Sequence, residues 1–132
     1  MNGSVVVDTS VVVDVLTNVP NIAAAVESRG VTVLHAPYAI DLEFLNVLRN
    51  LWLHSRITKQ EGARVIYEFS QMISVRHHHE ALLVRAWDLR NNVSASDALF
   101  VALAEHLDIP LITRDRRLAR SSGHTARIEF IE

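Results

Sequence analysis

The chain alternates short apolar runs with longer helical patterns, and this alternation limits the folds that it can adopt. Three consecutive valines, Val5–Val7, are typical of a central strand that is buried on both faces of a parallel sheet. Further short strands are expected at residues 31–34, 72–75, 109–112 and 128–131. Strands that alternate with helices build a parallel sheet, because each connection must cross back over a face of the sheet. The sequence therefore predicts an α/β fold with a mainly parallel sheet.

Start and stop signals place helices between these strands. Thr58 and Glu61 form a capping box, in which each side chain satisfies a backbone N–H group at the helix start. Helices are expected at residues 9–16, 20–30, 37–54, 58–71, 80–89 and 94–107, with a short helix after Asp115. No repeat or linker interrupts this pattern, so we expect a single domain over residues 1–132.

Composition excludes several kinds of site. The chain has no cysteine, so disulfides, thiolate metal sites and cysteine nucleophiles are excluded. No apolar run approaches the roughly 20 residues that are needed to span a bilayer. The apolar N-terminal stretch contains Asp8 and Asp14 and lacks the basic region of a signal peptide. We therefore expect a cytoplasmic protein with no membrane association.

Four carboxylates lie where the chain changes direction: Asp8, Glu43, Asp97 and Asp115. Asp8 ends the first strand and Asp115 closely follows the strand at 109–112, and sites in parallel sheets form outside the carboxyl ends of strands. Glu43 and Asp97 lie on predicted helices that can flank the same edge. Acids gathered in this way repel one another unless protons or a cation compensate, and oxygen ligands suit Mg²⁺ or Mn²⁺. The pattern indicates a metal-dependent phosphodiesterase.

Each acid also has a purely structural explanation. Asp8 and Asp115 are placed to cap the helices that follow them, since Asp is a favoured N-cap residue. Asp97 completes a capping-box pattern with Ser94, and most glutamates, as Glu43 could be, face solvent.

Two patterns favour a functional role for the helical acids. Glu43, Asn46 and Asn50 form one polar stripe on an otherwise apolar helix, although Asn is a mediocre helix former. Asp97 precedes the segment 98–104, which is apolar on all sides and therefore expected to be buried. An acid at the start of a buried helix lies near the positive end of the helix dipole and near the core.

Four segments resemble the motifs of a known family. They are Val5-Val6-Val7-Asp8-Thr9-Ser10, Glu43-Phe44-Leu45-Asn46-Val47-Leu48-Arg49, Ser96-Asp97-Ala98-Leu99-Phe100-Val101-Ala102-Leu103-Ala104, and Leu111-Ile112-Thr113-Arg114-Asp115-Arg116-Arg117-Leu118. Together and in this order, they resemble the PIN domain and, within it, the VapC-type toxins of bacterial toxin–antitoxin pairs. The resemblance runs over almost the whole chain.

The resemblance implies a PIN-like three-layer α/β/α sandwich and an endoribonuclease that depends on Mg²⁺ or Mn²⁺. It implies Asp8, Glu43, Asp97 and Asp115 as catalytic metal ligands, because all four acids of the family are retained. It also implies an RNA substrate, a cognate VapB-like antitoxin that inhibits the enzyme, and a homodimer. The residues before Asp97 depart from the family, where aromatic residues are often found, and this departure concerns contacts on the substrate side.

Several further residues are candidates for substrate binding. Thr9 and Ser10 could position a ligand or the cleaved phosphate, with helix capping as the alternative. Asn46 lies on the polar stripe. Arginines surround Asp115 and could hold RNA phosphates, with a solvated basic helix as the alternative; the candidates among them are Arg114, Arg116 and Arg117.

Other conspicuous side chains are expected to be structural. His77-His78-His79 is interpreted as a surface turn, because consecutive histidines rarely face one ion. Trp52 and Trp87 are expected to make core or dimer contacts.

Competing functions fit the sequence less well. A receiver domain needs a lysine after its last active strand, but the only lysine, Lys59, lies on a predicted helix in mid-chain. A haloacid-dehalogenase-like phosphatase needs a second Asp two residues after the first, where this chain has Ser10. The remaining alternative is a non-catalytic PIN-like module that binds RNA or protein.

Overall fold

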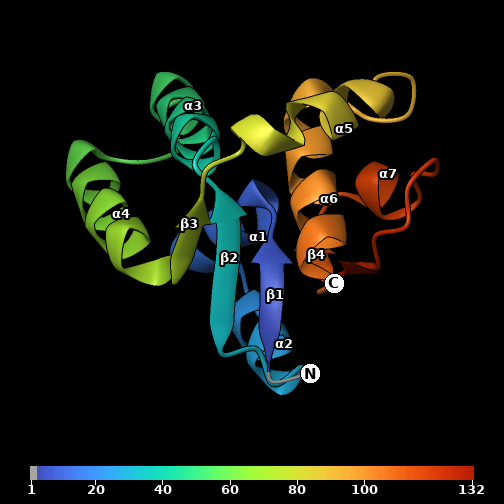
Figure 1. Ribbon diagram of the computed structural model, residues 1–132. Helices are drawn as coiled ribbons and strands as arrows, with labels where there is room; N and C mark the ends of the chain where they lie inside the picture. The colour runs from blue at the N-terminus through green and yellow to red at the C-terminus, as the bar shows by residue number, and fades with distance from the viewer. Residues whose placement is uncertain (1–2) are drawn as a thin grey trace.

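The computed structural model describes residues 3–132, which form a five-stranded parallel sheet with helices on both faces (Figure 1). The strands are β1 (Ser4–Val7), β2 (Val33–Pro37), β3 (Val75–His77), β4 (Leu111–Thr113) and β5 (Ile128–Phe130). Their order across the sheet is β3-β2-β1-β4-β5, and every neighbouring pair is parallel. The predicted α/β fold with a mainly parallel sheet is confirmed.

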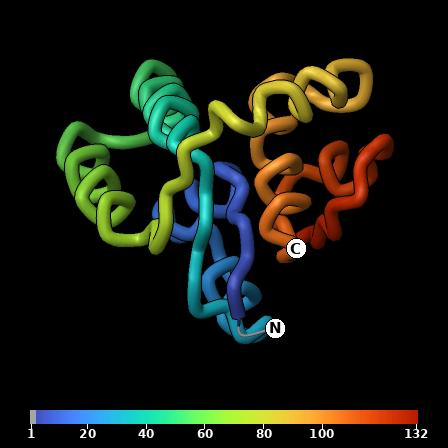
Figure 2. Tube along the Cα trace, in the orientation of Figure 1, coloured from blue at the N-terminus to red at the C-terminus, as the bar shows by residue number. Residues whose placement is uncertain are grey.

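The helices form the two outer layers of a three-layer sandwich. They are α1 (Thr9–Leu16), α2 (Ile22–Ser28), α3 (Ile40–Leu53), α4 (Lys59–Met72), the 3₁₀ helix η1 (Glu80–Leu82), α5 (Leu83–Asp88), α6 (Ala95–Leu107) and α7 (Arg116–Ala119). Helix α6 packs on β1, β2 and β4 at one face, and α5 packs on α6. Helix α1 lies behind the sheet in Figures 1 and 2, where it contacts α2, α3 and α4.

The core explains why the central strands are apolar without alternation. Val6 and Val7 of β1 and Leu111 and Ile112 of β4 are fully buried, because helices cover both faces of these two strands. The apolar segment 98–104 of α6 is also buried as expected, apart from the partly exposed Leu99. The carboxyl ends of β1 and β4 are therefore held on a rigid, fully packed base.

Boundaries differ from the predictions by a few residues at several elements. The strands expected at 31–34 and 72–75 lie at Val33–Pro37 and Val75–His77, because α4 continues to Met72 and the apolar residues before each strand belong to its approach. The helix expected from residue 37 begins at Ile40, since Pro37 is still paired in β2. The capping box is confirmed, with Thr58 and Glu61 exchanging two hydrogen bonds of 3.0 Å.

The histidine triplet is only partly the surface turn that the sequence predicted. His77 is the last residue of β3, and its Nε2 lies 2.9 Å from Nδ1 of His35 on β2. The two rings are stacked, with centroids 5.2 Å apart. The interpretation of His77 as a turn residue was therefore wrong, because it missed a strand pairing across 42 residues of sequence.

The two tryptophans are not core residues. Trp52 on α3 is 54% exposed and Trp87 on α5 is 65% exposed, so the core alternative is wrong and the dimer contact stays a prediction. Within residues 3–132, none of the helices has the length and apolar character needed to cross a bilayer.

We expect the His35–His77 pair to make the stability of the fold depend on pH. Partial burial lowers the pKa of both imidazoles, and the charges of His35 and His106 lower the pKa of His77 further. The folded protein thus favours the neutral rings. The contribution of the neutral rings to the free energy of unfolding is fully present above the unfolded-state pKa of about 6.5. It is lost as the pH falls through the lower pKa of the folded state. Thermal unfolding between pH 7.5 and pH 5 should show a smaller acid-induced fall in Tm for His35→Gln than for the wild type.

His54→Gln is the matched control for this experiment, because His54 is exposed and its ring hydrogen-bonds the carbonyl of Asn50 on the helix that it follows. Its pH profile should follow that of the wild type. If His35→Gln and the wild type lose equal Tm on acidification, the histidine pair does not contribute.

Candidate active site

The candidate site lies beside β1, the strand from which the sheet extends in two opposite directions along the chain. From β1 the chain goes to β2 on one side, and it later returns to β4 on the other side. Strands that leave in opposite directions open a crevice at their carboxyl ends. Asp8 follows β1 directly, and its backbone N–H donates to the Ile112 carbonyl of β4 at 3.0 Å. Asp115 follows Thr113, the last residue of β4. Both predicted strand-end acids therefore lie at this crevice.

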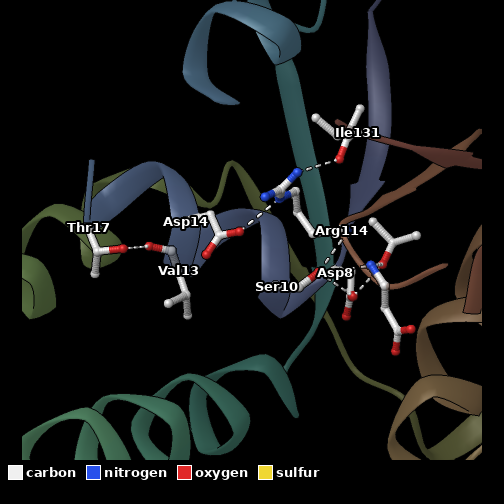
Figure 3. Close-up of polar contacts among 9 residues, drawn as sticks. Asp8, Ser10, Val13, Asp14, Thr17, Arg114 and Ile131 are labelled. Carbon is white, nitrogen blue, oxygen red and sulfur yellow. Dashed lines mark hydrogen bonds and ion pairs between the residues drawn. The ribbon is translucent and has the colours of Figure 1, made fainter. Parts of the chain in front are cut away.

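The carboxylate of Asp8 is held by two hydroxyl groups, one from the first turn of α1 and one from the end of β4. Oδ2 accepts hydrogen bonds from Ser10 Oγ at 2.8 Å and from Thr113 Oγ1 at 2.7 Å (Figure 3). Within the described part of the chain, the Asp8 side chain makes no capping hydrogen bond at the start of α1, although Asp8 is the N-cap residue. The capping explanation thus does not account for Asp8, which is only 5% exposed.

Backbone N–H groups also hold these two hydroxyls. Ser10 Oγ accepts from Arg114 N, and Thr113 Oγ1 accepts from Asp115 N, each at 3.0 Å. Each hydroxyl donates its single proton to Asp8, because a charged carboxylate can only accept. Burial raises the pKa of Asp8, while these two hydrogen bonds favour the charged form and lower it.

Glu43 of α3 is held between two other helices. Oε1 accepts from Thr9 Oγ1 of α1 at 3.2 Å, and Oε2 accepts a short hydrogen bond from Ser96 of α6. Burial raises the pKa of Glu43, and the two hydrogen bonds partly offset that rise. Glu43 is therefore not the solvent-facing helix residue of the structural explanation, and its contacts tie the two outer layers together across the crevice.

Asp97 and Asp115 differ in how their helices are capped. Ser94 caps α6 by accepting from Asp97 N at 3.2 Å, which leaves the Asp97 carboxylate out of the cap. Asp115 does cap α7, because its Oδ1 accepts from Arg117 N at 2.8 Å and from Leu118 N at 3.4 Å. The capping explanation is correct for Asp115. The two capping hydrogen bonds involve only Oδ1 of its carboxylate.

All four acids come to one edge of the sheet. Asp8, Glu43 and Asp115 line a hollow of about 500 Å³, which we call the acid hollow. Asp97 and Asp115 line a second hollow of about 310 Å³, which we call the Asn92 hollow after another of its residues. Burial, followed by the charge of Asp8 and to a lesser extent those of Asp115 and Glu43, raises the pKa of Asp97 to about 6.

This donor set fits a hydrated divalent cation. In residues 3–132, no three carboxylate or imidazole groups are placed to hold one ion together. Mg²⁺ is commonly bound through one or two carboxylates and keeps several waters, whereas Ca²⁺ takes six to eight oxygen ligands. Carboxylates that raise one another's pKa also gain most from a cation placed among them. The acids therefore fit Mg²⁺ or Mn²⁺ with part of its water shell retained.

The hydroxyl and amide candidates lie in or beside the acid hollow. Thr9 and Ser10 contact Glu43 and Asp8 as described, so their hydroxyls position acids. Asn46 lines the acid hollow one turn after Glu43, while Asn50 is exposed.

The arginines near Asp115 do not form one basic patch. Arg114 pairs with Asp14 at 2.8 Å and donates to the Ile131 carbonyl at 2.9 Å, so it braces the fold (Figure 3). The guanidinium of Arg116 lies 4.2 Å from the centre of the Phe130 ring. Arg117 lines the Asn92 hollow.

Sequence reasoning did not assign roles to Thr113 and Ser96, whose hydroxyls hold Asp8 and Glu43. The available signal was that Thr113 lies two positions before Asp115 and Ser96 lies one position before Asp97. That signal is weak, because the partners lie 105 and 53 residues away.

Comparison with known proteins identifies relatives over nearly the whole chain. The family model of the PIN domain matches residues 5–123. Ribonuclease VapC12 of Mycobacterium tuberculosis is 38% identical over 128 residues, which cover 96% of this chain and 98% of that protein. Ribonuclease VapC1 of the same organism is 35% identical over 130 residues, with 96% of each chain covered.

Solved structures share the fold at low sequence identity. VapBC2 from Rickettsia felis, bound to a DNA fragment from its promoter, matches with a TM-score of 0.69 and 11% identity over 98% of this chain and 99% of that chain. A toxin–antitoxin complex from Klebsiella pneumoniae matches with a TM-score of 0.63 and 17% identity, covering 88% and 90% of the two chains. These likenesses show the three-layer fold.

We expect Asp97→Asn to stabilise the metal-free protein at alkaline pH. Because the pKa of Asp97 is raised from 3.8 to about 6, folding favours its protonated form. The stability gained from the protonated Asp97 is complete below the pKa of the unfolded state, and it is lost as the pH rises through about 6. In EDTA, the substitution should raise Tm by a few degrees at pH 8 and change it little at pH 4.

The control is Asp108→Asn, because Asp108 has an 87% exposed side chain that pairs with Arg127, and it lies just after α6, at the opposite end of that helix from Asp97. It should not raise Tm at pH 8. Mg²⁺ should stabilise the wild type more than Asp97→Asn, and an equal response of both proteins would contradict the electrostatic explanation.

Proposed function

Because this chain belongs to the PIN domain family, we propose that it is an endoribonuclease that hydrolyses RNA phosphodiester bonds and serves as the toxin of a toxin–antitoxin pair. Its relatives at 35–38% identity are ribonucleases by name, and they match nearly end to end. The observation that carries the proposal is the gathering of four carboxylates from four separate elements at one sheet edge; they are Asp8, Glu43, Asp97 and Asp115.

These four acids would hold Mg²⁺ or Mn²⁺, directly or through water. When bound, the cation supplies an acidified water and stabilises charge on the phosphoryl oxygens. The hydroxyls of Ser10 and Thr113 favour the charged form of Asp8, which a cation requires, against the burial that raises its pKa. Thr9 and Ser96 fix both oxygens of Glu43. Attack by water leaves a 5′-phosphate and a 3′-hydroxyl, unlike attack by the 2′-hydroxyl of RNA.

The substrate would lie across the two hollows that meet at Asp115. Asn46 lines the acid hollow and offers an amide to the RNA. Arg116 and Arg117 are exposed and lie on the helix that Asp115 caps, where their charges attract phosphates. Arg114 would act indirectly, because its ion pair with Asp14 holds the β4 end in place.

A protein partner is supported by exposed apolar side chains on the helices. Leu45, Trp52 and Ile66 line a groove of about 530 Å³ between α3 and α4. Further exposed apolar residues lie on α5: Leu83, Val84 and Trp87. Apolar surface of this kind marks protein interfaces. We assign these surfaces to a VapB-like antitoxin and to a second copy of the chain. Residues 1–132 would form one domain that works in the cytoplasm.

The alternative is a PIN-like module that binds RNA or protein without cutting it. Such a module has no need of acids held in the charged form, so its RNA binding would survive their replacement. The buried Asp8 with two oriented hydroxyl donors favours the enzyme, because an unneutralised buried acid costs stability without a role in catalysis.

We expect the purified chain to cut RNA in Mg²⁺ or Mn²⁺ and to lose this activity in EDTA. Asp8→Asn removes the charge of the most buried acid and keeps its shape, so cleavage should fall by more than about a hundredfold. The measurement is the rate of product formation from total RNA, with sequencing of the new 5′ ends, and growth on induction of each variant as a second readout.

Asp41→Asn is the matched control, because Asp41 lies on α3 near Glu43 but pairs with Arg76 outside the hollows. It should retain near-wild-type cleavage. A folded wild-type protein that binds RNA but never cuts it, and binds equally well as Asp8→Asn, would favour the non-catalytic module.

A further inference from the structure

The Asn92 hollow lies beside the acids but is a separate depression with its own polar lining. Asp97 and Asp115 line it, and Asp115 is common to both hollows. The rest of its lining includes Arg117, Asn92 and the hydroxyl residues Ser94 and Ser121. Its volume of about 310 Å³ is at the lower end of the range for small-ligand sites.

Arg117 is the arginine of the Asp115 region that lines the Asn92 hollow. Arg114 is committed to Asp14, and Arg116 lies on Phe130 and 3.6 Å from Glu132. Arg117 is exposed, and no ion pair within residues 3–132 involves its side chain. Its backbone N–H bonds Asp115, so its position is coupled to that of a candidate metal ligand.

The position of Asn92 is set by close contact with the backbone at Gly123. A methyl group added at Gly123 would lie 2.6 Å from Asn92 Nδ2, and Gly123 has a φ of +88° that other residues rarely adopt. The loop around Gly123 is held on two sides. Arg85 donates to the Gly123 carbonyl at 3.3 Å, and Glu105 accepts from the backbone N–H of Thr125 at 2.8 Å. The wall that carries Asn92 is therefore preformed.

We propose that the Asn92 hollow is a subsite for one nucleotide of single-stranded RNA, next to the cleaved phosphodiester. Arg117 binds the phosphate of this nucleotide, and Asn92 hydrogen-bonds the edge of its base. The proposal rests on the proposed function and adds to it a specificity determinant that is separate from the acids.

Charge and geometry support this occupant. A phosphate beside four carboxylates is repelled, so the flanking phosphates of a substrate need a cation of the protein close to the site, and Arg117 supplies it. A side-chain amide offers both donors and an acceptor, which is the chemistry that reads a base edge. A duplex is not suited, because its base edges are paired and a narrow hollow admits only a base that is turned out of a helix.

The test uses the full chain and a pool of single-stranded RNA oligonucleotides with randomised central positions. Arg117→Gln should raise KM about tenfold with kcat within about twofold, as expected for loss of a charge-assisted phosphate contact. It should also reduce the slope of log affinity against log salt by about 0.7, measured on an Asp8→Asn background in Mg²⁺. Asn92→Ala should relax base preference at one position next to the cut.

Arg120→Gln is the matched control, because Arg120 is exposed at the end of the same helix and does not line the hollow. It should change KM and the salt slope by less than half as much. Arg117→Lys should keep the salt slope, which separates a phosphate contact from a folding defect.

Two results overturn the subsite. In the first, the wild type cuts the pool, but Arg117→Gln and Arg120→Gln have the same KM and the same salt slope. Asn92→Ala also keeps the base preference of the wild type. The other is a wild type that neither cuts nor binds the pool, and this result overturns the proposed function as well.

Discussion

The structure depends on keeping an ionisable group, Asp8, buried at the end of a central strand. A buried carboxylate is unfavourable unless donors or a cation compensate it. Here Ser10 and Thr113 each donate to Asp8, and the backbone N–H groups of Arg114 and Asp115 in turn donate to these two hydroxyls. The same hydrogen bonds join β1, α1 and the turn after β4. The charge of one residue thus determines how three segments meet.

The other acids extend this arrangement outward. Glu43 is tied to α1 and α6 through Thr9 and Ser96, so helices from both outer layers are linked at the crevice. Asp97 remains outside its own helix cap, and its pKa near 6 reflects the burial and negative charge that surround it. The site is therefore assembled by hydroxyl groups that hold the acids in place despite their mutual repulsion.

The fold and the acids could be predicted from sequence because each follows from a local rule. Val5–Val7 indicates a strand buried on both faces, and the strand-end rule places Asp8 and Asp115 together. The hydrogen bonds that hold the acids could not be predicted, because Thr113 contacts Asp8 across 105 residues. The pairing of His35 with β3 was missed for the same reason, and three of the strands begin two or three residues later than expected.

The bond from Arg114 to the Ile131 carbonyl has a practical consequence for attaching other groups to the protein. Ile131 also donates from its backbone to Thr113, one hydrogen bond away from Asp8. A fusion partner or surface linker joined after Glu132 would therefore emerge beside the acids and could obstruct a long polymer. A segment joined ahead of β1 would emerge at the opposite end of that strand, away from the site (Figure 1).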